Sequence, residues 1–216
     1  MRFLLRVALA VVAGACVAIG YMVSVATPPG PRSLAAFDAD RVAALETDMW
    51  RAYYDHRNAH LFTDLVTMTH EQYRYPWSKA TVAGFHLARA ASRFAVAHGY
   101  YEEVLPDLEQ AYTIAREWTH ASFDPKSVAR AELAWWVARR IPGDDSPEHV
   151  GGLIADLYAQ LYEVPRERVL AAATLRARAG WLRDQGGDHA DWAQVSTLLL
   201  QSYRELHAAV AVTAAR

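Results

Sequence analysis

Apolar residues recur along most of the chain at intervals of three and four, which is the pattern of helices that bury one face. The pattern is densest in residues 125–141, where apolar side chains extend around nearly the whole helical circumference. Such a helix leaves little surface for water, so we expect neighbouring helices to wrap it. Its apolar positions are Val128, Ala131, Leu133, Ala134, Trp135, Trp136, Val137, Ala138 and Ile141.

Capping residues, prolines and glycines divide the rest of the chain into further helices. Asp124 before Pro125 predicts the start of the central helix, and Pro142-Gly143 predicts its end. No segment alternates as a strand does, and no repeat of fixed period is present. The sequence therefore predicts an all-α fold, a closed multi-helix bundle of seven or eight helices that follows an N-terminal transmembrane or signal segment. The other predicted helices cover residues 35–56, 79–98, 102–119, 147–161, 165–186 and a last segment from 188 or 191, while 57–75 is left open as a second helix or a continuation of the first.

Residues 1–26 form the first predicted segment, in which Arg2 and Arg6 precede an uncharged run. This run is long enough to cross a bilayer core of roughly 30 Å as a single-pass transmembrane anchor. A cleaved signal peptide ending at Ala26 and a lipoprotein modified at Cys16 are the two alternatives. All three place a Pro-rich linker, 27–34, and a helical domain, 35–216, on the periplasmic or extracellular side.

Small residues line one face of the helix predicted for residues 1–26. Ala10, Gly14 and Ala18 follow one another at intervals of four and so share one helix face. Small side chains let two membrane helices approach closely. We therefore expect membrane protein partners, reached through this helix and through the helical domain, in addition to the lipid bilayer.

Composition narrows the classes of function. Cys16 is the single cysteine, so the domain that follows it can form neither an internal disulfide nor a cysteine-ligated metal centre. The formal net charge is −2, with no basic run, so nucleic acid is not an expected partner. Neither a GxSxG nucleophile motif nor a phosphate-binding glycine loop occurs.

Three polar residues interrupt apolar helix faces and form the sharpest candidate site. Glu46, Glu132 and His207 belong to three different predicted helices and together could hold a metal ion. The Glu-x-x-His spacing of di-iron bundles is absent. The alternative is that the carboxylates form structural ion pairs, Glu132 with Arg139 or another buried arginine, and Glu46 with Arg57 or a tyrosine hydroxyl.

Other histidines offer weaker candidate sites. His56 and His60 are four residues apart and so are expected to share a helix face, with Asp64 one turn further, but no third ligand is evident. His86 or His207 could ligate a non-covalent haem, whereas a CxxCH motif for covalent haem is absent. No cofactor is predicted.

One side of the helix predicted for residues 79–98 is basic. His86, Arg89 and Arg93 form this side, which either faces solvent or contacts an acidic partner or anionic lipid.

Taken together, these features predict a non-enzymatic, membrane-anchored accessory or binding subunit of a larger membrane complex, for example an energy-transducing one. The alternative is a metal- or haem-dependent helical-bundle enzyme or carrier that uses Glu46, Glu132 and His207.

Overall fold

The computed structural model describes the backbone of residues 2–211 and the side chains of residues 12–211. The predicted all-α fold is confirmed: within the described backbone, eight α-helices follow the N-terminal helix, and no strand is present. The helices are α1 (Arg2–Val25), α2 (Ala39–Tyr54), α3 (Asn58–Tyr73), α4 (Trp77–Val96), α5 (Leu105–Thr119), α6 (Pro125–Ala138), α7 (Pro147–Tyr162), α8 (Arg166–Gly186) and α9 (Trp192–Ala211), with short 3-10 turns η1 (Tyr101–Val104) and η2 (Gly187–His189).

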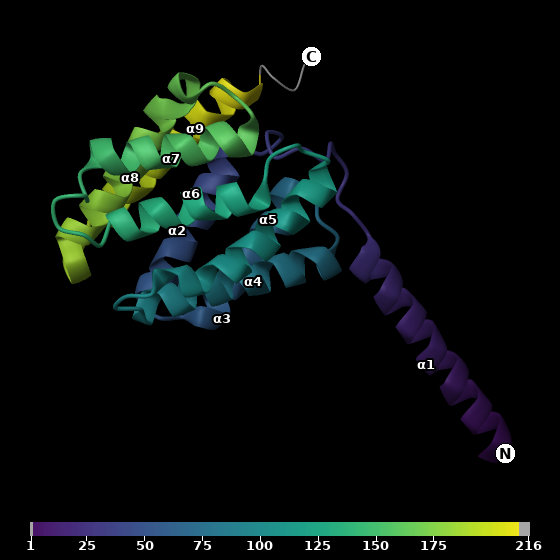
Figure 1. Cartoon of the computed structure of the whole chain (residues 1–216). Coiled ribbons are helices and arrows are strands. Elements are labelled where there is room, and N and C mark those ends of the chain that lie inside the picture. The colour runs from purple at the N-terminus through teal and green to yellow at the C-terminus, as the bar shows by residue number, and fades with distance from the viewer. Residues whose placement is uncertain (1, 212–216) are drawn as a thin grey trace.

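Helices α2 to α9 form a closed ring. Each packs against the next along the chain, and α9 closes the ring by packing against α2. Helices α7, α8 and α9 lie on one side, while α3, α4 and α5 lie on the other (Figure 1). Helices α2 and α6 connect these two groups, so the interior of the bundle is bordered by residues far apart in the sequence.

Local sequence signals fix where several of these helices begin. The side chain of Asp124 accepts hydrogen bonds from the backbone N–H groups of Lys126 and Ser127, and Pro125 follows it as the first residue of α6. Asp38 caps α2 in the same way. Such caps each contribute about 0.5–2 kcal/mol. Helix α6 ends at Ala138, slightly earlier than predicted.

A short turn separates α2 from α3. His56 has a φ of 56°, in the left-handed region, and the backbone N–H of Arg57 bonds to the carbonyl of Ala52 at 2.8 Å. A non-glycine residue in this conformation cannot continue a right-handed helix. The segment that the sequence left open is therefore two helices.

The expectation that α6 is wrapped on every side is wrong. Trp135 is buried, but Lys126, Arg130 and Ala134 are exposed along the outer side of α6. Because α6 belongs to a ring, it packs mainly against α5 and α7 and presents its remaining side to solvent.

Helix α1 extends away from the ring (Figure 1). In the part of the chain that the structure describes, no helix combines the length and the apolar character needed to cross a membrane. The transmembrane segment expected over residues 1–26 is therefore not supported, and the side chains of its first eleven residues lie outside the described ones. Of the small residues expected to pack against a partner helix, Gly14 and Ala18 are exposed, and Ala10 lies outside the described side chains.

Candidate functional site: a central aromatic cavity

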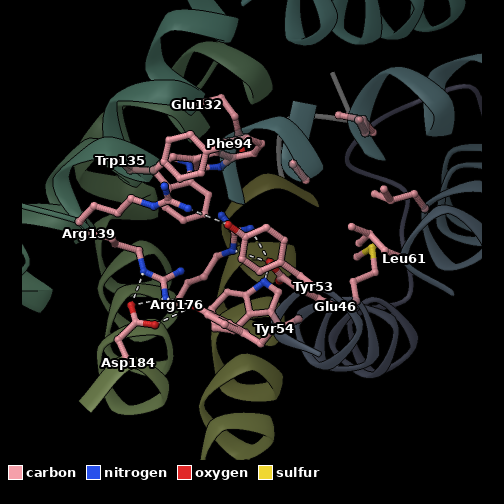
Figure 2. A pocket seen from close by; sticks show the side chains of 17 residues that line it. Glu46, Tyr53, Tyr54, Leu61, Phe94, Glu132, Trp135, Arg139, Arg176 and Asp184 are labelled. Atoms are coloured by element: carbon pink, nitrogen blue, oxygen red, sulfur yellow. Dashed lines mark hydrogen bonds and ion pairs between the residues drawn. The ribbon is translucent and has the colours of Figure 1, made fainter. Parts of the chain in front are cut away.

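The interior of the ring contains a cavity of about 330 Å³. Helices α2, α3, α4, α6 and α8 contribute its walls, so its lining comes from residues distributed over most of the domain (Figure 2). Aromatic rings make up much of this lining, with aliphatic side chains from α3 and α4. The rings are Trp50, Tyr53, Tyr54, Phe94, Trp135 and Trp136.

Glu46 of α2 forms a buried ion pair with Arg176 of α8. Arg176 Nε donates to Glu46 Oε1 at 2.9 Å, and Arg176 Nη2 donates to the same oxygen. Trp50 Nε1 also donates to Oε1, at 3.1 Å. The expected partners of Glu46, Arg57 or a tyrosine hydroxyl, are therefore wrong, because an arginine of α8, far away in the sequence, pairs with this carboxylate.

Glu132 of α6 is held by neutral donors. Trp136 Nε1 donates to Oε1 and the hydroxyl of Tyr112 donates to Oε2, both at 2.8 Å. The expected pairing with Arg139 or another buried arginine is wrong. Each carboxylate oxygen of Glu132 accepts one hydrogen bond, and these two bonds fix the orientation of the side chain.

Arg139 lies just after α6 and pairs with α8 instead. Its Nε donates to Asp184 Oδ2 at 3.1 Å, and its Nη2 donates to the hydroxyl of Tyr54 at 2.8 Å and to the carbonyl of Gly180 at 3.1 Å. A Cβ atom at position 180 would lie only 2.8 Å from Arg139 Cζ, so glycine is needed for this approach. Arg140 beside it donates to the carbonyl of Ala97 at 3.0 Å.

Guanidinium groups also cover the faces of lining rings. Arg140 Cζ lies 3.9 Å from the centroid of the Phe94 ring, and Arg176 Cζ lies 4.7 Å from that of Trp135. Arg139 Cζ is 6.0 Å from the same Trp135 ring. These distances are those of cation–π contacts, so part of the π surface around the cavity already has a cation.

Two buried polar atoms of the lining have no partner among the described residues. They are Glu46 Oε2, an acceptor, and Trp135 Nε1, a donor. Leaving a buried polar group without a hydrogen bond costs about 1–3 kcal/mol. Both atoms have almost no accessible surface, so they are enclosed by the packing around the cavity and do not form part of its open surface.

Three buried tyrosines that interact electrostatically with the Glu46–Arg176 pair are neutral at physiological pH. Burial raises the pKa of Tyr73 to about 12. Burial likewise raises the pKa values of Tyr158 and Tyr203 above their ordinary range. These hydroxyls therefore stay protonated, and none of the three tyrosines lines the cavity.

The structure brings together two of the three residues of the candidate metal site. Glu46 and Glu132 line the same cavity, but His207 does not, because it packs edge-on against Phe37 with ring centroids 5.2 Å apart. Among residues 12–211, no group of three or more histidine, cysteine, aspartate or glutamate side chains is arranged to hold a metal ion.

The histidine pair of the α2–α3 region does not share a helix face. His56 is exposed in the turn that separates the two helices, whereas His60 belongs to α3 and lies 3.5 Å from Asp64. The expected i, i+4 geometry is wrong because it required an unbroken helix through residues 55–57.

Asp107 of α5 neutralises the basic side of α4. Its carboxylate is almost fully buried, bonded to His86 Nδ1 at 2.8 Å and to Arg89 Nε at 2.7 Å, while Arg93 Nη1 lies 3.8 Å away. The acidic partner that the sequence suggested for this face is supplied by the chain itself. His86 is one of the two histidines considered as a haem ligand, and its Nδ1 is engaged by this carboxylate.

This cluster predicts a loss of stability in acid. Burial alone raises the pKa of Asp107, but hydrogen bonds from Arg89 and His86 outweigh it, so its pKa lies below the ordinary value. The stability that these bonds contribute is complete above the pKa of unfolded aspartate, about 3.9, and is lost as the pH falls through the lower folded pKa. Urea unfolding should therefore show that the difference between wild type and Asp107→Asn shrinks below about pH 4.

The exposed Asp144→Asn variant is the control for this series, because no such difference is expected for it. A difference between wild type and Asp107→Asn that stays constant from pH 6 to pH 3 would contradict the account of this cluster.

Sequence reasoning missed Arg176 and Asp184. A signal for Arg176 exists, since it shares a face of α8 with the buried residues Val169, Ala172 and Ala173. An arginine on an otherwise apolar face requires a buried partner.

Comparison with protein families, curated proteins and solved structures finds no match to this chain.

Proposed function

We propose that this chain is a non-enzymatic binding protein whose helical domain takes a small organic molecule into its central cavity. The observation that carries this proposal is the cavity itself, whose lining is largely aromatic and comes from five helices. A volume of about 330 Å³ is within the range of small-molecule sites. The charged groups that face it are held by ion pairs and hydrogen bonds, which favours binding over proton transfer.

A cavity-filling substitution tests this function. Ala91 of α4 lines the cavity, so Ala91→Phe should fill part of it and exclude a ligand. The probe is 5-fluoroindole, a neutral aromatic molecule, titrated into the full chain in mild detergent and followed by ¹⁹F NMR. We expect saturable binding to wild type and at least a tenfold loss, equivalent to about 1.4 kcal/mol, in Ala91→Phe.

The control variant is Ala134→Leu, because Ala134 is exposed on α6 and does not line this cavity. It should bind the probe as wild type does. Equal affinity of wild type and Ala91→Phe, or no saturable binding to wild type, would refute the proposed binding function.

We further propose that residues 1–26 hold the domain at a membrane as an accessory subunit of a larger complex, with the domain on the periplasmic or extracellular side. The uncharged run after Arg2 and Arg6, and the small side chains at Gly14 and Ala18, support this proposal. Purification in mild detergent should recover partner proteins with wild type and lose them with Gly14→Leu. Val12→Leu, on the opposite side of α1, is the control, and a single monomeric species in every case would refute the proposal.

A further inference from the structure

Helix α1 meets the helical domain at one end only. It contacts α4 and extends away from the rest of the ring (Figure 1). From Val12 to Val25 it contains no charged residue, and its large apolar side chains are exposed. Exposed apolar surface of this extent marks contact with a membrane or with another protein. The part of the domain beside α1 is therefore the part closest to whatever covers this helix.

Two cations lie where α1 joins the domain. The segment between α1 and α2 is fixed to the core, because its Leu34 and Phe37 side chains are buried. Arg32 of this segment lies against Trp118, with its Cζ 3.8 Å from the ring centroid. Lys79 of α4 lies near the same ring, with its Nζ 5.9 Å from the centroid. These contacts hold Arg32 and Lys79 close to the start of α4.

The charges of these two cations are not balanced by an ion pair. No carboxylate of residues 12–211 forms an ion pair with Arg32 or Lys79. Arg32 is exposed and Lys79 is partly exposed, and α4 contains no acidic residue. The domain therefore presents positive charge beside α1, where an anionic surface would be attracted to it.

The outer side of α4 adds exposed aromatic and aliphatic surface to these cations. Trp77, Val82 and Phe85 are 41%, 49% and 49% exposed. The ring of Trp77 stacks on His70, with centroids 3.7 Å apart, so one face of the indole is held while the rest of the side chain stays accessible. Tryptophan at the level of the headgroups, next to lysine and arginine, is typical of protein surfaces at a membrane–water interface.

From these observations we infer that the start of α4 rests on a membrane surface that contains anionic lipids. Trp77 and Phe85 lie among the headgroups, and Arg32 and Lys79 lie beside the lipid phosphates. A bilayer is favoured over an acidic protein because the adjoining α1 exposes apolar side chains all round, and lipid can cover every side of such a helix. This inference rests on the proposed membrane location and names the surface of the domain that contacts the lipid.

Contact between Trp77 and lipid tests the inference. The full chain, ¹⁵N-labelled at tryptophan, is placed in nanodiscs of phosphatidylcholine and phosphatidylglycerol that contain headgroup spin labels. The indole N–H signal of Trp77, assigned by its absence in Trp77→Phe, should be lost through broadening. Trp181 is the control, because it is also 41% exposed but belongs to α8, on the other side of the ring. Its signal, assigned in the same way, should remain.

Removal of the two cations tests the need for anionic lipid. The double variant Arg32→Gln/Lys79→Gln should lower the ratio of docked to undocked domain about 30-fold, because each cation near an anionic bilayer contributes about 1 kcal/mol. The Trp77 signal should then return, as it should for wild type in nanodiscs of phosphatidylcholine alone. Arg168→Gln/Arg178→Gln is the control, because both arginines are exposed on α8. Equal broadening of Trp77 in all of these samples would overturn the inference.

Recovery of the chain with the nanodiscs separates failure of this inference from failure of the proposed membrane location. If the chain elutes with the nanodiscs but Trp77 keeps its signal beside spin-labelled lipid, the inference fails alone, and this side of α4 is left to a protein partner. If the chain does not stay with the nanodiscs, both proposals fall.

Discussion

Replacement of Arg176 by methionine is expected to lower the free energy of unfolding by about 3–5 kcal/mol. Methionine fills much of the same space but leaves the carboxylate of Glu46 buried without a counter-charge. The effect should be large because both side chains are shielded from water, with exposures of 12% for Arg176 and 3% for Glu46. Urea unfolding of the full chain, followed by circular dichroism, measures the change.

Two further variants show whether this loss comes from the unpaired charge. Arg204→Met breaks an ion pair with Asp40 in which both side chains are 60% exposed, so the free energy of unfolding should change far less than in Arg176→Met. The double variant Glu46→Leu/Arg176→Met removes both charges and should recover most of the stability lost in Arg176→Met. Equal losses in Arg176→Met and Arg204→Met would show that the pair is not buried as described.

Truncation of Leu199 to alanine should cost about 2–5 kcal/mol. Leu199 is fully buried on α9, the helix that closes the ring by packing against both α8 and α2. Deleting its side chain removes apolar contacts and leaves a void that the surrounding helices fill only in part. The same unfolding experiment measures this loss.

Leu198 provides a matched comparison, since it is the same residue type in the same helix but only partly buried. Leu198→Ala should cost less than half as much as Leu199→Ala, because less apolar surface leaves water when it folds. Similar losses in the two variants would contradict the orientation of α9 and the closed ring.

The helices of this protein are largely predictable because their signals are local. Asp124 followed by Pro125 marks the start of α6 through one capping side chain and one fixed φ angle. The break at His56 was not predictable, because the apolar pattern continues across it and its left-handed backbone is a property of a single residue.

The cavity was only half predictable from the sequence. Periodicity identified Glu46 and Glu132 as polar groups on apolar faces, and both line it. The partner of Glu46 could not be assigned, because the contact of its side chain with Arg176 of α8 depends on how the ring closes and not on spacing along the chain. Glu132 was expected to pair with a charged arginine, but its hydrogen-bond donors are the neutral side chains of Tyr112 and Trp136.

The most direct measurement of the central claim is the indole N–H signal of Trp135 in a ¹⁵N-labelled full chain. The signal is assigned by its absence in Trp135→Phe. On saturation with 5-fluoroindole, it should change position because Trp135 lines the cavity that the probe fills, while the signal of exposed Trp181 stays in place. A Trp135 signal that does not move at saturating probe would contradict the account.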